Sequence, residues 1–575
     1  MKTDGFIQKG RQWMAQENNA AMTIFLLFFL VTFAKTLLFN HFAFYNDLAM
    51  TFKESPEKFF GSLLCKLSVS LILASFVFLL KDKRWMILVS FIIDAWCIAN
   101  LIYMRNNNIL LDGEAFNQAG NIHGYSSSVL IYIEWGIDLI FLLLTALWSL
   151  IFIFTSKSDR IAPLWIIVLF GGVILRLAGD GLNDSLGNNL MKRDSREEVF
   201  GWSFSQAVRH TSVIESPIYV VSDYFAMKNK KMPYHPMTRQ NKFHIEPLVN
   251  TNDYHANNEP LIIILVESLE NWVCRPDIMP NLWRLANSEH VLYADKIHTQ
   301  IVGAPSADGQ MIINTGLLPI NAGATCLHYP HNTYPALMKI TDERSVCLLS
   351  HDTRVWNQTE MSPAFGYDTT IVWSDVDTLL FAELNRLIDN GERHIQCITQ
   401  STHAPFLNHT LSSLELPHDM PWVMSNYIGA FNALDYGLGL FIQKLENDPK
   451  LQDYTVVITG DHRILHREAR QRMMRWSQRN GLDYNVGNDY LPLIVYSPRI
   501  EGNIHYTAEA YQMDIYPTVL NILGAKDYLW KGIGANLLDD EAVAHRYTSP
   551  AEAASTCDRM IRNDYFGKLK KENKN

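Results

Sequence analysis

The chain has 575 residues, of which 48% are hydrophobic and 19% charged, and its formal net charge is -10. A chain of this length exceeds what one hydrophobic core usually organises, so we expect more than one domain. The acidic balance and a pI near 6.0 leave no basic stripe that could neutralise phosphates, which argues against a nucleic-acid partner.

Five long apolar stretches occupy the first 180 residues. They cover residues 20–39, 60–80, 85–104, 128–155 and 162–178. Each is close to the roughly 20 residues that a helix needs to cross a hydrocarbon core. The first stretch lacks a clear small-residue cleavage site and is followed by four more, so it is interpreted as an anchor rather than a signal peptide. Residues 1–180 are therefore predicted to form a transmembrane domain of five helices.

Basic residues predict the orientation of these helices. They cluster before the first stretch and in the second and fourth connections, at Lys2, Lys9, Arg11, Lys81, Lys83, Arg84, Lys157 and Arg160. Short loops rich in lysine and arginine stay on the cytoplasmic side. Five crossings from an inside N-terminus then place everything after residue 180 outside the cytoplasm.

Several ionisable residues fall in or near the predicted spans, where a charge is unfavourable and is a candidate for function. They are Lys35, Lys66, Asp94, Glu134, Asp138 and Arg176. Two interpretations remain open. These groups pair between helices or reach the membrane surface, or they form a polar path that holds a lipid headgroup or carrier.

Residues 181–255 are predicted to be a linker with amphipathic helices. The segment "VFGWSFSQAVRHTSVIESPIYVVSDYF" has helical periodicity with aromatic residues. Such a helix lies either on the membrane surface or against a folded domain.

Five cysteines follow in the external part, at Cys274, Cys326, Cys347, Cys397 and Cys557. Their number and irregular spacing predict no disulfide pairing.

Residues 256–575 show strand, turn and helix in repeated order, which indicates an α/β domain. "PLIIILVES" reads as a strand buried on both faces of a parallel sheet, and Glu267 follows it. "YTVVITGDH" delivers Asp461 and His462 in the same way, and "HIQCITQSTHAPF" leads to His403. Because ligands bind beyond the carboxyl ends of strands in such sheets, these side chains outline a metal site.

The stretch "GAPSADGQMIINTG", residues 303–316, predicts a turn that enters a helix at Ser306. Ser306 is either an ordinary helix cap or a nucleophile. A divalent ion held by nearby carboxylates and imidazole would lower the pKa of its hydroxyl, and a helix start favours an anion such as phosphate. The predicted carboxylates therefore favour the nucleophile. Asp308 and Gln310 flank Ser306 and are candidates to orient it.

The order "LVESLE", "GAPSADGQMI", "QSTHAPF", "ITGDH" and "YQMDIYPTVLNILG" resembles the lipoteichoic acid synthase and phosphoglycerol transferase branch of the alkaline phosphatase and sulfatase superfamily, over essentially the whole chain. The resemblance implies five membrane helices followed by an extracytoplasmic α/β sulfatase-like (alkaline phosphatase-like) domain. It implies metal ligands at Glu267, Ser306, Asp461 and His462, with Ser306 as nucleophile. It places His403 at the substrate phosphate.

The segment "LLSHDTRVWNQTEMSPAFGYD" resembles the part of the family that holds the lipid headgroup. The implied substrate-binding residues are His351, Asp352, Arg354, Trp356, Asn357 and Gln358, together with His403. Synthases that handle glycerol phosphate have an arginine directly after Trp-Asn, whereas this chain has Gln358. A glutamine does not replace the bidentate fork of arginine at a phosphate, so the headgroup stays open between glycerol and ethanolamine.

The resemblance implies a phosphoglycerol transferase that takes its group from phosphatidylglycerol in the outer leaflet and passes it to a glycan or lipid acceptor through phospho-Ser306. The expected cofactor is one divalent ion, Mn²⁺ first, with Mg²⁺ or Zn²⁺ as alternatives. The expected location is the cytoplasmic (inner) membrane of a bacterium. A phosphoethanolamine transferase, a hydrolase of the sulfatase or phosphodiesterase type and a scaffold without turnover are the alternatives.

Overall fold

The computed structural model describes residues 19–45, 52–53, 56–107, 109–113, 115, 126–153, 160–184, 202–221, 258–321, 323–525, 528, 530–544 and 550–572. Its contacts separate two compact units. The first comprises Met1–Asn117 with Tyr132–Lys231, and the second comprises Gln118–Ile131 with Met232–Asn575. The sequence did not indicate that part of the connection between the third and fourth spans groups with the second unit.

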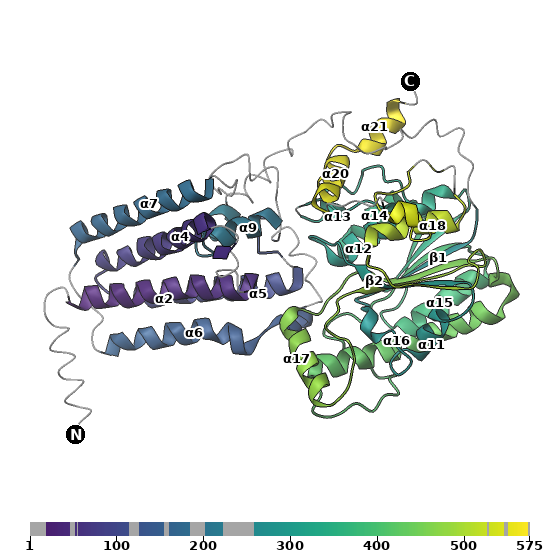
Figure 1. The fold of residues 1–575 in the computed structure, drawn as a ribbon, viewed down its shortest axis with the longest axis horizontal. Helices are drawn as coiled ribbons and strands as arrows, with labels where there is room; N and C mark the ends of the chain where they lie inside the picture. Colours follow the sequence, from purple (N-terminus) through teal and green to yellow (C-terminus); the bar gives the residue numbers. More distant parts are fainter. Residues whose placement is uncertain are drawn as a thin grey trace. The chain divides into compact units, whose positions relative to one another are not determined.

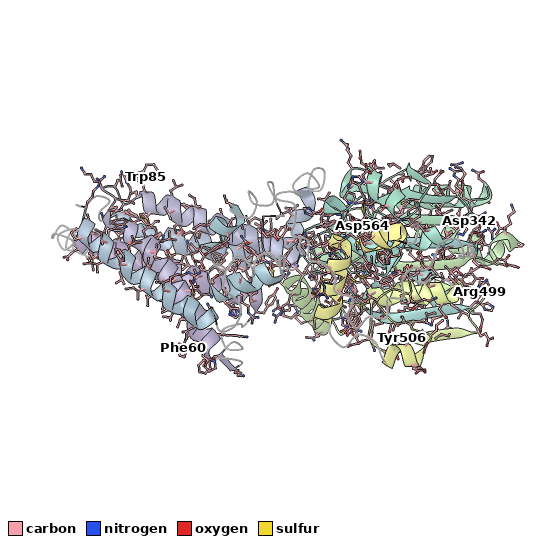
Figure 2. All side chains as sticks on the ribbon, turned by 90° about the horizontal axis from the view of Figure 1, so that it is seen from above. Phe60, Trp85, Asp342, Arg499, Tyr506 and Asp564 are labelled. Atoms are coloured by element: carbon pink, nitrogen blue, oxygen red, sulfur yellow. The ribbon has the colours of Figure 1, made fainter. Side chains whose placement is uncertain are left out.

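Five helices of the first unit are long and apolar enough to cross a membrane, as predicted. They are α2 (Asn19–Phe44), α4 (Pro56–Ser75), α5 (Trp85–Asn107), α6 (Trp135–Ser149) and α7 (Ala162–Asp184), with 3-10 extensions η1 (Phe76–Phe78) and η4 (Leu150–Ile153). The exposed rings of Phe60 and Trp85 project from this unit (Figure 2). Apolar groups that face outward suit a surface covered by lipid.

The fourth helix begins at Trp135 rather than at residue 128, because residues before it form the 3-10 helix η3 (Ser126–Tyr132). Three consecutive serines open η3. Serine hydroxyls compete for backbone hydrogen bonds and favour turns over helix interiors, which accounts for the later start.

Several of the charged residues within the helices form ion pairs. Lys35 Nζ lies 2.5 Å from Asp94 Oδ1, with both side chains fully buried. The Arg105 guanidinium donates to both oxygens of Asp138 at 2.9 and 2.8 Å. Arg176 donates to both oxygens of Glu215. These contacts agree with pairing between helices, one of the two alternatives left open by the sequence.

Removing one partner of the buried Lys35–Asp94 pair should destabilise the helical unit. Lys35 also donates to Ser90 Oγ and Thr145 Oγ1, at 2.7 and 2.6 Å, but neither group carries a charge. We expect Asp94→Leu to lower the free energy of unfolding by about 3–5 kcal/mol, because an uncompensated charge stays buried. Thermal unfolding of the full chain in detergent measures this. The double variant Lys35→Met with Asp94→Leu should recover most of the loss, and equal melting temperatures for the two variants would contradict the argument.

The helix α9 (Trp202–His210), from the predicted linker, packs against α4. Its Phe204 and Val208 are buried in the same apolar cluster as the spans. Lys66 Nζ donates to the carbonyl oxygen of Arg209 at 2.8 Å, which satisfies one of the orphan carbonyls at the end of α9. This part of the linker therefore packs on the helical unit, while residues 185–201 and 222–255 lie outside the described residues.

One mixed sheet organises the second unit. Its described strands are β1 (Leu261–Val266), β2 (Val291–His298), β3 (Ser345–Leu349), β4 (Thr369–Val372), β5 (His394–Ile398), β6 (Thr455–Gly460), β7 (Leu491–Tyr496), β8 (Asn503–Tyr506) and β9 (Ala510–Tyr511). The order is β4-β3-β5-β1-β6-β7-β2-β8, and β9 pairs with β2. The strand β7 runs antiparallel to β6 and β2, and the other pairs are parallel.

Helices cover both faces of this sheet (Figure 1). On one face lie α12 (Pro305–Thr315) and α18 (Ile515–Ile522), and on the other lie α15 (Asp377–Asp389) and α16 (Trp422–Asn447). The other helices are α11 (Pro280–Ala286), α13 (Thr325–His328), α14 (Gln358–Ala364), α17 (Arg467–Arg479), α19 (Asp540–Ala544), α20 (Pro550–Arg562) and α21 (Tyr565–Glu572). All residues of the central strand β1 are buried, as its continuous apolar run predicts. All seven cysteines are free and buried in the structure.

Candidate active site

The three strands that carry the predicted site residues are neighbours in the sheet. The strand β1 lies between β5 and β6 and is parallel to both. Val266 pairs in register with Gly460, so the next residues, Glu267 and Asp461, leave the sheet side by side. The segment that ends in His403 leaves β5 at the same edge. The sheet order thus brings together residues that lie far apart in the chain.

Glu267, Asp461 and His462 form a compact buried cluster whose ligand atoms all lie within 4.8 Å of one another. His462 Nε2 lies 3.4 Å from Glu267 Oε1 and 3.5 Å from Asp461 Oδ2. His462 Nδ1 lies 2.8 Å from the carbonyl oxygen of Arg463, an acceptor that keeps the proton on Nδ1 and leaves Nε2 free to bind a cation. The sequence predicted this set of residues, and the structure places them together.

The electrostatics of this cluster fit a divalent cation. Among the described residues, Asp461 Oδ2 is buried without a hydrogen-bond partner. Burial and the charge of Glu267 raise the pKa of Asp461. Burial acts to lower the pKa of His462, but the two carboxylates outweigh it and raise that pKa. Crowded carboxylates that would otherwise take up protons can instead share a cation, and their oxygens with an imidazole nitrogen suit Mn²⁺ or Zn²⁺.

Ser306 joins this cluster through its hydroxyl. Its Oγ donates to Glu267 Oε2 at 3.2 Å and lies 3.3 Å from His462 Nε2. The helix α12 has Ala304 at its N-cap position and Pro305 as its first residue, so Ser306 lies inside the first turn. The simple helix-cap interpretation therefore does not describe Ser306. Its side chain is half-buried, which leaves a route for a substrate.

The backbone around Ser306 is held by its neighbours. Asp308 Oδ2 accepts three hydrogen bonds, at 2.9 to 3.0 Å, from the amides of residues 302–304. A Cβ atom at Gly309 would collide with the carbonyl group of Asp461, so only glycine allows α12 to approach the end of β6 this closely. Asp308 thus supports the turn before the serine, and Gly309 sets the distance between Ser306 and the cluster.

His403 directly follows Thr402, whose Oγ1 donates to the carbonyl oxygen of Glu267 at 2.6 Å. The loop that carries His403 is held by Asp377, whose carboxylate accepts from the amides of Gln400 and Ser401 at 3.0 and 2.9 Å. His403 Nδ1 lies 2.9 Å from the carbonyl oxygen of Ala404. This contact holds the ring of His403 at its Nδ1 side.

The predicted headgroup segment has a strained backbone. Trp356 and Asn357 have φ angles of 50° and 54°, in the left-handed region that non-glycine residues rarely adopt. Asn357 Nδ2 donates to the carbonyl oxygen of Cys326 at 3.0 Å and so helps to hold this turn. Strain of this kind gathers at ligand-binding sites, where it costs about 1–3 kcal/mol per residue.

The side chains of this segment differ in where they point. Burial lowers the pKa of His351, and its Nδ1 lies 3.1 Å from the carbonyl oxygen of Asp352. Arg354 is 87% exposed and donates to both oxygens of Asp352 at 3.0 and 2.8 Å.

Gln358 is buried in the protein. Its Nε2 donates to Gln310 Oε1 at 2.6 Å, and the reverse hydrogen bond measures 3.3 Å. The resemblance implied that Gln358 contacts the headgroup. In the structure, its side-chain amide is instead hydrogen-bonded inside the protein. Gln310 likewise supports α14 rather than touching Ser306.

Other residues of the site did not stand out in the sequence. Ser268 has a φ of 60°, and its Oγ donates to Glu267 Oε1 at 2.6 Å while its amide donates to Asp461 Oδ1 at 2.8 Å. Thr402 Oγ1 donates to the carbonyl of Glu267, and Thr399 Oγ1 accepts from its amide. In the sequence, the indication available for Ser268 and Thr399 was their position just after the end of a strand. Gln512, which donates to the carbonyl of Asp461, carried none.

Both parts of the chain match known protein families. Residues 7–200 match the lipoteichoic acid synthase N-terminal domain, and residues 261–525 match the sulfatase family. Lipoteichoic acid synthase 2 of Bacillus subtilis (strain 168) is 24% identical over 330 residues, which cover 51% of this chain and 49% of that protein. A lipoteichoic acid synthase of Staphylococcus saprophyticus is 22% identical over 563 residues, which cover 89% of this chain and 84% of that protein. The chain therefore spans about half the length of the first relative and most of the second.

Among solved structures, the lipoteichoic acid synthase LtaP from Listeria monocytogenes is 21% identical, covering 57% of this chain and 96% of that chain with a TM-score of 0.45. The lipooligosaccharide phosphoethanolamine transferase A (EptA) from Neisseria meningitidis is 12% identical, covering 88% and 96% with a TM-score of 0.47. Both TM-scores lie below 0.5. The family of the chain is therefore identified by the two family matches and by the relatives in sequence, and not by these structures.

Proposed function

Because the chain belongs to the lipoteichoic-acid-synthase-like branch of the alkaline phosphatase and sulfatase superfamily, we propose that it is a membrane-anchored, metal-dependent phosphoglycerol transferase. The observation that carries the proposal is the position of Ser306 Oγ, 3.2 Å from Glu267 Oε2 and 3.3 Å from His462 Nε2. A half-buried hydroxyl at a cluster of two carboxylates and an imidazole is arranged for nucleophilic attack.

The anchor agrees with a lipid donor. The chain is a multi-pass membrane protein with an extracytoplasmic catalytic domain. Phosphatidylglycerol in the outer leaflet of a bacterial cytoplasmic membrane keeps its acyl chains in the bilayer while its phosphate faces outward. An enzyme fixed to the same bilayer meets this donor at high effective concentration. A soluble phosphate ester would require no anchor.

The reaction has two steps. In the first, Ser306 Oγ forms a bond to phosphorus, the bond from phosphorus to the diacylglycerol oxygen breaks, and that oxygen gains the proton that the serine loses. In the second, a hydroxyl of a glycan or lipid acceptor attacks phosphorus, the bond to Ser306 Oγ breaks, and the serine regains a proton. The product carries the phosphoglycerol group on the acceptor, and both steps balance without any redox co-reactant.

Each residue of the site has a task in these steps. Glu267, Asp461, His462 and Ser306 would hold one divalent ion, Mn²⁺ in our proposal, which would lower the pKa of the serine hydroxyl and offset phosphate charge. His403 donates to the phosphoryl oxygens and exchanges the proton of the leaving oxygen. His351, Trp356 and Asn357 line the approach of the headgroup, and Arg354 and Asp352 form its exposed rim.

The donor can be tested directly. Full-length protein in mixed micelles with Mn²⁺ is incubated separately with fluorescent phosphatidylglycerol and fluorescent phosphatidylethanolamine, and diacylglycerol release is measured. We expect release from phosphatidylglycerol. Release from phosphatidylethanolamine alone would identify that lipid as the donor instead. Release from neither lipid would contradict a lipid-donor transferase.

A further inference from the structure

The connection between α5 and α6 contributes a polar side chain to the catalytic unit. Its described part begins at Ser126, and the residues up to Ile131 belong to the same compact unit as the sheet. Within that unit Ser128 contacts the loop that carries His403, although 275 positions separate the two residues. No motif in the sequence indicated this contact.

Two oxygen atoms face Nδ1 of the His403 ring. Ser128 Oγ donates to the carbonyl oxygen of Ala404 at 2.7 Å and lies 3.3 Å from His403 Nδ1. The same carbonyl oxygen lies 2.9 Å from Nδ1. Ser128 is half-buried, so these hydrogen bonds compete only partly with water.

This geometry determines which ring nitrogen carries a proton. The Ala404 carbonyl can only accept, and Ser128 Oγ, having donated its proton to that carbonyl, can only accept as well. Two acceptors therefore face Nδ1, which must be the protonated nitrogen. The hydrogen bond at one nitrogen of a histidine sets the role of the other, so Nε2 becomes the nitrogen that exchanges a proton with a substrate.

We propose that Ser128 is a positioning residue for His403, and that the connection between the third and fourth spans thereby completes the active site. The inference rests on the proposed function, in which His403 Nε2 acts on the phosphoryl group. Ser128 orients the imidazole and holds its tautomer but does not touch the substrate. Removing the hydroxyl leaves the Ala404 carbonyl as the remaining acceptor at Nδ1 and frees it from Ser128, so the ring is held less firmly, which slows chemistry more than it weakens donor binding.

The test compares four full-length proteins in proteoliposomes with Mn²⁺: the unaltered chain, Ser128→Ala, Ser128→Thr and Val129→Ala. Each is assayed on phosphatidylglycerol and on the soluble diester bis(4-nitrophenyl) phosphate. We expect Ser128→Ala to lower kcat about 10-fold on both, with KM changed by less than about twofold, as partners of active-site histidines do. Ser128→Thr keeps a hydroxyl and should restore kcat. Val129→Ala changes an exposed neighbour on the same turn and should leave kcat unchanged.

A double-mutant cycle separates positioning from general stability. If Ser128 acts through His403, adding Ser128→Ala to His403→Ala produces no further loss. An unchanged kcat in Ser128→Ala, no rescue by Ser128→Thr, or a full 10-fold loss on top of His403→Ala would each overturn the proposal. If His403→Ala is too slow to measure, the contrast between alanine and threonine at position 128 decides.

The two substrates allow the inference about Ser128 and the proposed function to be tested separately. Hydrolysis of the soluble diester without diacylglycerol release contradicts the lipid donor, while the effect of Ser128→Ala on hydrolysis still decides the inference. Diacylglycerol release that is indifferent to Ser128 overturns only the inference. Turnover of neither substrate by the unaltered chain overturns both.

Discussion

Replacing Ser306 with alanine should abolish diacylglycerol release from phosphatidylglycerol, with a loss of at least about 10³-fold in kcat. The hydroxyl is the one group placed both to attack phosphorus and to contact Glu267 and His462, at 3.2 and 3.3 Å. No other described side chain at this edge offers a half-buried hydroxyl in that position. The loss is measured as initial rates of release from fluorescent donor, with protein amounts matched by gel filtration.

Ser306→Thr provides the matched control. Threonine keeps a hydroxyl at the same atom, and the N-terminal turn of α12 tolerates it, so we expect activity within about tenfold of the unaltered chain. Mass spectrometry of quenched protein should find a phosphoglycerol adduct on the peptide that contains Ser306, and none in Ser306→Ala. Retained release in Ser306→Ala would show that another group attacks phosphorus.

Removal of the divalent ion should also stop the reaction. After chelation and dialysis, release should fall at least about 10²-fold, and added Mn²⁺ should restore it, because the cation in the proposed mechanism would activate the serine. A bound ion also stabilises the folded state, by about 2.7 kcal/mol at a hundred times its Kd. The catalytic unit should therefore melt at a higher temperature with Mn²⁺ than without, which is a readout independent of turnover.

Asp461→Asn tests whether this stabilisation arises at the proposed site. The amide can still accept from the backbone of Ser268 and His462, as Asp461 Oδ1 does at 2.8 Å, but it lacks the charge that a cation requires. We expect the variant to lose both activity and the Mn²⁺-dependent rise in melting temperature. Asp435→Asn is the control, since Asp435 is a buried carboxylate that accepts from the amides of Asn281 and Leu282 at 2.9 Å, away from the cluster. A Mn²⁺ effect that survives in Asp461→Asn and disappears in Asp435→Asn would place the ion elsewhere.

Much of the candidate catalytic site was accessible from the sequence because its signals are local. A buried strand has a recognisable apolar run, and a polar residue that follows it must lie at the sheet edge. That reasoning identified Glu267, Asp461 and His462, which the structure brings within 4.8 Å of one another. The five spans were predicted for a similar reason, since the length of an apolar helix can be counted along the chain.

Other predictions left alternatives open, and only the tertiary contacts distinguish between these alternatives. The apolar pattern marks Lys35 and Asp94 as unusual but contains no information that α2 and α5 place them 2.5 Å apart. Gln358 occupies a position that the family resemblance assigns to the headgroup, yet its amide pairs with Gln310 in the core. The start of α6 shifted because serines at 126–128 prefer a turn, an effect that hydropathy does not register.

By itself, the sequence determined the elements of this protein: five membrane helices, an α/β domain, and the polar residues that end its strands. Periodicity and strand length are properties of neighbouring residues, so they can be read without knowledge of the fold. The tertiary structure alone decided that β1 lies between β5 and β6, that Ser306 faces Glu267, and that Ser128 reaches the loop of His403. These contacts join residues far apart in the chain, and they depend on the order in which strands and helices pack rather than on any local pattern.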